Sequence, residues 1–283
     1  MKLEAAPIQT ADGVQIFGGY WEPTVAGAVT PVDAWLLLPG ASGSFYSQVQ
    51  GPFAEALTAA GYPVLTLSTR GHDLAWQNRS NGRLYGLAAE IIAEAGRDIV
   101  AGLDELERRG ARQIGLLGHS MGAIKCSYFL ANEGDPRVRV FAQVSGGRVG
   151  RPRWESAPHR DKVEACLVQA QNLLDEGRGD ELTLFDSTMA APSYFTPRSF
   201  LDRHLDDRYD TLKLAARFTV PTIFVGGSEE PEMITQELLD QFKAQATGAK
   251  PVTATMIAGA DHFYTGKARE AIAAVVAFAR EIG

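Results

Sequence analysis

The sequence has few features that would place the protein in a membrane, in an oxidising compartment or around a metal ion. It contains only two cysteines, Cys126 and Cys166, in 283 residues. Two cysteines cannot form a disulfide framework and cannot by themselves complete a zinc site. No run of about 18 apolar residues is present, and the first residues lack the apolar core of a signal peptide. We therefore expect a cytoplasmic protein with reduced thiols and no membrane partner.

The sequence also lacks an excess of basic charge and the common cofactor motifs. Its 27 basic and 34 acidic side chains give a net charge of −7 and are not clustered, which argues against a nucleic-acid partner. There is no Walker loop, no G-x-G-x-x-G after the first predicted strand, and no His/Cys cluster with metal-ligand spacing. We expect neither a nucleotide cofactor nor a metal. The apolar fraction of 45% is that of a globular protein.

What is present is an alternation of apolar, β-rich runs with amphipathic segments, which is typical of a mostly parallel sheet covered by helices. The turn signal Asp12-Gly13 predicts an opening hairpin. The predicted strands are Ile8–Thr10, Val14–Tyr20, Ala34–Leu38, Pro63–Leu67, Gln113–Leu117, Val138–Val144, Pro221–Val225 and Val252–Ile257. The predicted helices are Phe53–Ala60, Leu87–Arg109, Ala123–Asn132 and Ala268–Arg280. We expect Asp98 to lie on a solvated face of the second helix.

The segment 146–218 interrupts this alternation. It is richer in charge, contains no convincing parallel strand, and has one clear helix over Lys162–Asp175. We interpret it as a cap inserted into a core domain formed by residues 1–145 and 219–283.

A serine lies in a glycine-rich pentapeptide, Gly118-His119-Ser120-Met121-Gly122, between a predicted buried strand and a predicted helix. The G-x-S-x-G pattern in this context is the nucleophile elbow, a sharp turn that exposes the serine hydroxyl at the edge of the sheet. The turn needs small residues two positions before and after the serine, and both are glycine here. We expect the elbow to turn the His119 side chain away from the site.

The elbow and the order of elements resemble the α/β-hydrolase superfamily over nearly the whole chain. The resemblance implies an eight-stranded, mostly parallel sheet flanked by helices, with a helical cap. It also implies the chain order nucleophile, acid, histidine. His262 fits the histidine position because it comes just after the last predicted strand. A base there would take the proton of Ser120.

The resemblance implies an acid in the loop after Pro221–Val225, where the family has Gly-x-x-Asp-Pro. Matching Gly227 and Pro231 selects Glu230, whereas matching Gly226 selects Glu229. We favour Glu230 and keep Glu229 as the alternative. The loop after Val138–Val144 begins Ser145-Gly146-Gly147-Arg148 and offers no carboxylate.

The same resemblance implies two backbone donors for the developing oxyanion. Met121 supplies the first N–H. The second is expected from Ala41, with Ser42 as the alternative, in the loop that begins Pro39-Gly40.

These residues predict a cofactor-independent serine hydrolase that cleaves a carboxylic ester of a small acyl substrate. Phe45, Tyr46 and Trp76 are candidates for the pocket lining. An amidase, lactonase, thioesterase, C–C hydrolase or acyltransferase would use the same three residues, and a small-ligand-binding protein on a hydrolase fold is the non-enzyme alternative. A homodimer is compatible with the sequence.

Overall fold

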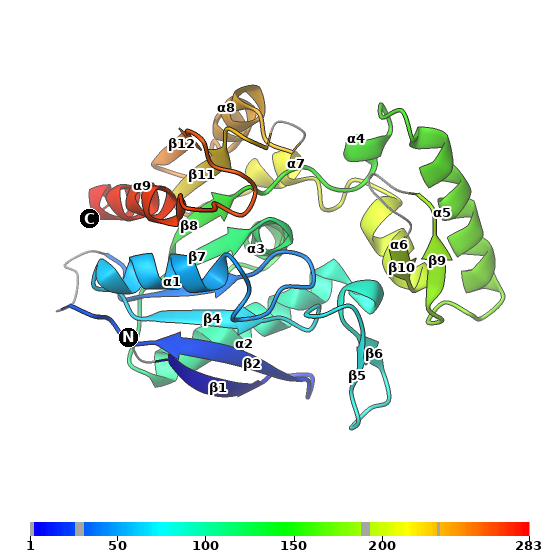
Figure 1. Ribbon diagram of the computed structural model, residues 1–283, viewed down its shortest axis with the longest axis horizontal. Coiled ribbons are helices and arrows are strands. Elements are labelled where there is room, and N and C mark those ends of the chain that lie inside the picture. Colours follow the sequence, from blue (N-terminus) through cyan, green and yellow to red (C-terminus); the bar gives the residue numbers. More distant parts are fainter. Residues whose placement is uncertain (1–2, 26–30, 188–192, 231–232, 283) are drawn as a thin grey trace.

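The computed structural model describes residues 3–25, 31–187, 193–230 and 233–282 (Figure 1). Its centre is an eight-stranded sheet in the order β1-β2-β4-β3-β7-β8-β11-β12. The β1–β2 and β2–β4 pairs are antiparallel, and all the other pairs are parallel. This arrangement confirms the expected mostly parallel sheet with an opening hairpin. The strands of the sheet are β1 (Leu3–Gln9), β2 (Gln15–Trp21), β3 (Ala34–Leu38), β4 (Val64–Ser68), β7 (Ile114–His119), β8 (Val138–Val144), β11 (Thr222–Gly227) and β12 (Val252–Ile257).

Helices cover both faces of the sheet, as the apolar runs require. All five residues of β3 are buried, and they alternate between two hydrophobic layers. Trp35 and Leu37 pack in the layer of α1 and α9, whereas Leu36 and Leu38 pack in the layer of α2, α3, α7 and α8. The core helices are α1 (Gln50–Ala59), α2 (Ala95–Arg108), α3 (Met121–Asn132), α7 (Thr211–Ala215), α8 (Gln236–Gln245) and α9 (Ala268–Glu281).

The segment expected to form a cap lies beyond the carboxyl ends of the strands, on the right of Figure 1, and keeps the name cap as a label only. It has its own small core, in which the rings of Phe185 and Phe200 stack at 4.4 Å between centroids. Its elements are α4 (Arg151–Trp154), α5 (Arg160–Asp175), β9 (Thr183–Phe185), β10 (Ser193–Phe195) and α6 (Pro197–His204). Leu214 and Phe218, near the end of the expected insertion, pack in the main core. The boundary at residue 218 stays a prediction.

The prediction of one long helix over Leu87–Arg109 is wrong for its first two turns. The structure has two short 3₁₀ helices, η1 (Leu87–Ala89) and η2 (Ile92–Glu94), before α2 begins. Glu90 between them is extended, with φ −70° and ψ 129°. Its buried carboxylate lies 2.5 Å from Lys125 Nζ of α3 and 3.4 Å from Arg203 Nη2 of α6. The chain leaves the helix here because a long-range ion pair holds Glu90.

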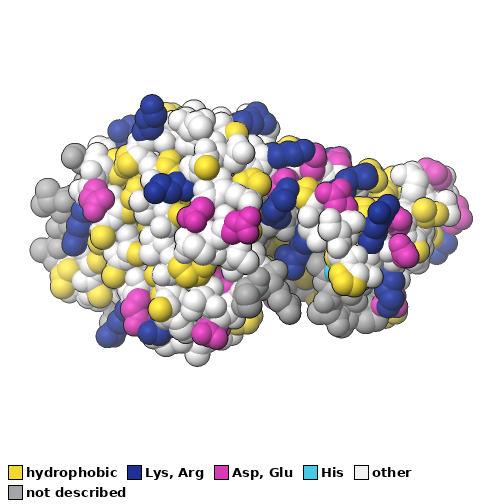
Figure 2. All heavy atoms as spheres, turned by 90° about the horizontal axis from the view of Figure 1, so that it is seen from above, with side chains coloured by type: hydrophobic (Ala, Val, Ile, Leu, Met, Phe, Trp, Pro, Cys, Tyr) yellow, Lys and Arg dark blue, Asp and Glu magenta, His cyan; other side chains and the backbone are white. Residues whose placement is uncertain are grey.

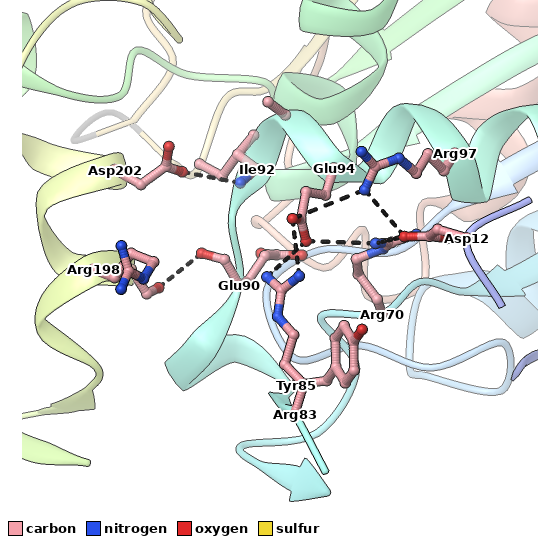
Figure 3. Close-up of polar contacts among 12 residues, drawn as sticks. Asp12, Arg70, Arg83, Tyr85, Glu90, Ile92, Glu94, Arg97, Arg198 and Asp202 are labelled. Carbon is pink, nitrogen blue, oxygen red and sulfur yellow. Dashed lines mark hydrogen bonds and ion pairs between the residues drawn. The ribbon is translucent and has the colours of Figure 1, made fainter. Parts of the chain in front are cut away.

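The same break joins the core to the cap. The Ile92 N–H donates to Asp202 Oδ2 of α6 at 3.0 Å (Figure 3). In an unbroken helix this N–H would bond to a carbonyl four residues earlier. The backbone therefore exchanges a helical hydrogen bond for one that anchors the cap.

The prediction that Asp98 lies on a solvated helix face is also wrong, because Asp98 is fully buried. It receives hydrogen bonds from Arg70, through the backbone N–H at 2.8 Å and the side-chain Nε at 3.0 Å. Arg70 also pairs with Asp12 in the turn of the opening hairpin (Figure 3). Asp98 faces inward because it pairs with a buried arginine from the loop after β4. Two short strands of that loop, β5 (Trp76–Gln77) and β6 (Leu84–Tyr85), form a separate hairpin.

Basic and acidic side chains intermingle over the face of the molecule drawn in Figure 2. No helix within the described ranges combines the length and apolar character needed to cross a membrane.

Candidate active site

Three of the expected site residues follow the carboxyl ends of parallel strands. Ser120 comes directly after β7, Glu230 follows β11, and His262 follows β12. Because the carboxyl ends of parallel strands meet at one edge of a sheet, loops after different strands can bring distant residues together. This edge is where the structure places all three side chains.

Ser120 occupies a strained backbone conformation, with φ 53° and ψ −121°. Non-glycine residues rarely adopt a positive φ, and such strain is typical of functional sites. The neighbouring glycines are required by close approach. A Cβ at Gly118 would lie 2.5 Å from the Gly122 carbonyl oxygen, and one at Gly122 would lie 2.4 Å from the Leu38 carbonyl oxygen. The turn is the sharp strand-to-helix turn that the pentapeptide predicts.

The three side chains form a hydrogen-bonded chain. His262 Nδ1 lies 2.6 Å from Glu230 Oε2, and His262 Nε2 lies 3.0 Å from Ser120 Oγ. A carboxylate only accepts hydrogen bonds, so Nδ1 carries the proton. Nε2 of the neutral ring is then the acceptor that faces the serine hydroxyl. This is the arrangement in which a histidine can remove a serine proton.

Glu230 is buried, and both of its carboxylate oxygens accept hydrogen bonds. The Gly227 N–H donates to Oε1 at 2.7 Å, and Ser145 Oγ donates to the same oxygen. Burial alone would raise the pKa of Glu230, but the hydrogen bonds from His262, Ser145 and Gly227 outweigh it and hold the pKa below the ordinary 4.5. The carboxylate is therefore ionised at neutral pH.

Ser145 and Tyr264 extend the hydrogen-bonded chain, although the sequence pattern predicts no role for either. Ser145 follows β8 directly, at φ 49°. Its only proton goes to Glu230, so the Tyr264 hydroxyl is the donor in the 2.8 Å contact with Ser145 Oγ. The signal in the sequence was the position of Ser145, at the end of a buried strand beside the one that carries the acid.

The alternative acid and the neighbour of the histidine lie elsewhere. Glu229 is exposed, and its backbone N–H bonds to the Ala260 carbonyl. Asp261 Oδ1 accepts from the backbone N–H groups of Phe263 and Thr265, so it shapes the loop. Pro231, which guided the choice of Glu230, lies outside the described residues.

The expectation that the elbow turns His119 away from the site is wrong. His119 lines the same cavity as Ser120, and its Nε2 bonds to the His262 carbonyl oxygen at 2.7 Å. Burial, aided by the nearby His262, lowers the pKa of His119 to about 4. The ring is therefore neutral and positions the backbone of the His262 loop.

Two backbone segments border the serine. Met121 is the first residue of α3. Its N–H therefore has no acceptor within the helix. Ala41 lines the cavity, whereas Ser42, at φ 55°, forms an isolated bridge with His72. Gly40 keeps this loop close, because a Cβ there would lie 3.2 Å from Ser120 Cβ.

A cavity of about 220 Å³ opens beside the serine. Its lining comes from the β3–α1 loop, the start of α1 and the loops that carry Ser120 and His262, and consists of Pro39, Gly40, Ala41, Gly43, Ser47, Gln48, Val49, Gln50, His119, Ser120, His262 and Phe263. None of the described residues that line it is acidic, lysine or arginine. The cavity therefore suits an uncharged group.

The aromatic residues expected to line a pocket are not among those that line this cavity. Tyr46 is 68% exposed and packs edge-on against Phe45. Trp76 stacks between His72 and Tyr85, at 5.0 Å from each ring. Their ring contacts are with one another or with other loop residues, and none of the three lines the cavity beside Ser120. In the described segments, no group of three or more His, Cys, Asp and Glu side chains could hold a metal ion.

Comparison with known proteins identifies one family. A model described as the alpha/beta hydrolase family matches residues 35–275, which is most of the chain and includes Ser120, Glu230 and His262. No curated relative matches the chain.

Several solved structures share the whole fold at low sequence identity. One is described as DcsB in complex with its substrate analogue (TM-score 0.72, 14% identity, 99% of both chains covered). Another is the alpha/beta hydrolase GrgF from Penicillium sp. sh18 (TM-score 0.71, 14% identity, 99% of both chains). A third is Est1E from Butyrivibrio proteoclasticus (TM-score 0.64, 16% identity, 99% of both chains). At these identities the likeness is one of fold.

Proposed function

Because the chain belongs to the alpha/beta hydrolase family, we propose that it is a serine hydrolase that cleaves a carboxylic ester, or a related acyl compound, through an acyl-enzyme on Ser120. The observation that carries the proposal is the hydrogen-bonded chain from Ser120 Oγ to His262 at 3.0 Å and from His262 to Glu230 at 2.6 Å. A serine hydroxyl is a weak nucleophile until an oriented base removes its proton.

In the proposed reaction Ser120 Oγ attacks the ester carbonyl while His262 Nε2 takes the hydroxyl proton. Glu230 holds the ring and stabilises the imidazolium that forms. His262 then returns the proton to the leaving alkoxide, the ester C–O bond breaks, and the acyl group stays on Ser120. Water activated by His262 attacks the acyl-enzyme and releases the carboxylic acid.

The negative charge on the carbonyl oxygen needs preorganised donors at the moment of attack. We assign this role to the N–H groups of Met121 and Ala41. Met121 begins α3, whose N-terminus favours negative charge. Loss of one such donor typically costs about 2.7–4 kcal/mol of transition-state stabilisation.

The proposal is tested with p-nitrophenyl esters of increasing acyl length, assayed with the wild type and with Ser120→Ala. We expect turnover by the wild type and none above background by the folded variant. Equal turnover by the two proteins would remove Ser120 from the mechanism. A folded wild type that binds esters without cleaving them would favour a ligand-binding protein.

A further inference from the structure

Gln50 is a buried polar residue whose side-chain amide has no hydrogen-bond partner in the described structure. It is the first residue of α1, and its exposed fraction is 0%. Neither Oε1 nor Nε2 of its amide has a hydrogen-bond partner among the described residues. Leaving a buried polar group without a partner is costly, so each such group in a native protein needs an explanation.

Its location supplies one, because Gln50 lines the cavity that contains Ser120 and His262. It lies on the inward face of α1, with Phe53, Ala54 and Leu57 at helical spacing. The terminal torsion of a glutamine is broad. Rotation about it can therefore turn either the amide oxygen or the amide nitrogen towards a group in the cavity.

His119 adds an acceptor to the same cavity. Its Nε2 must carry the proton, because the His262 carbonyl to which it bonds can only accept. The other nitrogen of the neutral ring, Nδ1, is therefore an acceptor. Nδ1 lies close to Gly40, since a Cβ on Gly40 would be 3.5 Å from it. The lining thus offers hydrogen bonds and, among the described residues, no acidic, lysine or arginine side chain.

We propose that this cavity is a subsite for an uncharged hydrogen-bonding group of the substrate, of the carboxamide kind, and that Gln50 is the residue that selects it. The inference rests on the proposed function, because it assigns the cavity to the substrate of Ser120. A carboxamide matches Gln50 best, since each amide carries both a donor and an acceptor.

The chemistry of the lining disfavours the other ligand classes. A purely aliphatic group would leave the Gln50 amide unpaired, and sites built to hydrogen-bond a substrate strongly reject analogues that lack the polar group. A carboxylate or ammonium would find no opposite charge on the described lining residues, and an unpaired buried charge is costly.

The volume of the cavity determines which test ligands can fit into it. A cavity of about 150 Å³ holds benzene, so about 220 Å³ accommodates a ring with a small substituent. Benzamide, toluene and benzoate have nearly the same shape and differ in the group presented to Gln50. Their dissociation constants can be measured by ligand-observed NMR titration, which needs no turnover.

We expect benzamide to bind the wild type about tenfold more tightly than toluene or benzoate. In Gln50→Leu and in Gln50→Met, benzamide should lose this advantage while toluene keeps its affinity. Retained toluene binding and a cooperative thermal transition show that a variant is folded with its cavity intact. Gln245→Leu, an exposed change on α8, is the matched control and should keep the preference for benzamide.

The inference is overturned if benzamide binds the wild type no better than toluene, or if the preference survives in both Gln50 variants. It is also overturned if benzamide does not slow the labelling of Ser120 by a fluorophosphonate, because it then binds elsewhere. Failure of the proposed function looks different, since the wild type would then resist labelling while NMR still reports binding.

Discussion

Glu230 shows how single residues determine the geometry of the site. One carboxylate oxygen accepts from Gly227 and Ser145, which leaves the other oxygen for His262. Tyr264 in turn donates to Ser145. The position of the histidine thus depends on residues that do not line the cavity beside Ser120. We regard Ser145 as a positioning residue.

Ser145→Ala should lower kcat about tenfold with little change in KM. A hydrogen bond to a charged group contributes about 1.5–3 kcal/mol, and its loss frees the carboxylate to move. Because Ser145 stabilises the ionised form, its removal should raise the pKa of Glu230 and shift the acidic limb of the pH–rate profile upwards. Tyr264→Phe, which keeps Ser145, should have a smaller effect. An unchanged kcat and pH profile in Ser145→Ala would contradict the positioning role.

Glu230→Gln should lower kcat by about 10³–10⁴-fold, because an amide favours the wrong histidine tautomer. Glu229→Gln is the matched control on an exposed neighbour and should stay within about twofold of the wild type. Steady-state kinetics on one p-nitrophenyl ester measures both. The reverse ranking would assign the acid role to Glu229.

The sequence alone could predict only part of this site. The elbow and the position of His262 follow from local pattern and chain order. The spacing allowed either Glu229 or Glu230, and only the folded loop shows that one is exposed and the other buried against His262. For Ser145 the sequence offers only its position after a buried strand, and its hydrogen bond to Glu230 forms only on folding. Gln50 carries no local signal, because its place in the cavity depends on how α1 packs.

At the scale of elements, the β7–α3 turn carries Ser120 and also packs closely against the end of β3. Gly122 brings α3 against the end of β3, so a Cβ there would meet the backbone oxygens of Leu38 and Pro39 at 2.4 and 2.5 Å. Backbone cannot move aside as a flexible side chain can. The central strands β3, β4, β7 and β11 were predictable because each is a continuous buried run. The break before α2 was not, because Glu90 leaves the helix for partners on α3 and α6.

Gly122→Ala should destabilise the protein by about 1–3 kcal/mol, the usual cost of overpacking. Gly51→Ala is the control, because a Cβ at that position in α1 meets nothing within 4 Å. Alanine is the better helix former by up to about 1 kcal/mol, but Pro52 follows and disfavours a helical alanine before it, so Gly51→Ala should change the stability less than Gly122→Ala does. Urea unfolding of both variants measures the difference. Equal stability of the two would contradict the close approach at the turn.

At the scale of the whole molecule, buried charges connect separate parts of the chain. Arg70 joins the hairpin turn at Asp12 to α2 at Asp98, and Glu90 joins α3 to the cap. Burial would raise the pKa of Asp12, but hydrogen bonds and charge from Arg70 hold it well below the ordinary 3.8. Stability from this pair is therefore present above pH 3.8 and lost as the pH falls through the folded-state pKa.

Asp12→Asn should be less stable than the wild type at pH 7, and the difference should shrink as the pH falls below 3.8. The asparagine cannot ionise, so it makes no pH-dependent contribution to the free energy of unfolding. Urea unfolding at a series of pH values gives the two free-energy curves. A constant difference at all pH values would show that the Arg70–Asp12 ion pair does not contribute through its charge.

The central claim is that the assembly of Ser120, His262 and Glu230 at one edge of the sheet activates the serine. The most direct measurement is labelling of the wild type and of Ser120→Ala with a fluorophosphonate, followed by mass spectrometry of the modified peptide. We predict one phosphonyl group on Ser120 of the wild type and none on the folded variant. A folded wild type that stays unlabelled, or a label on another residue, would contradict the claim.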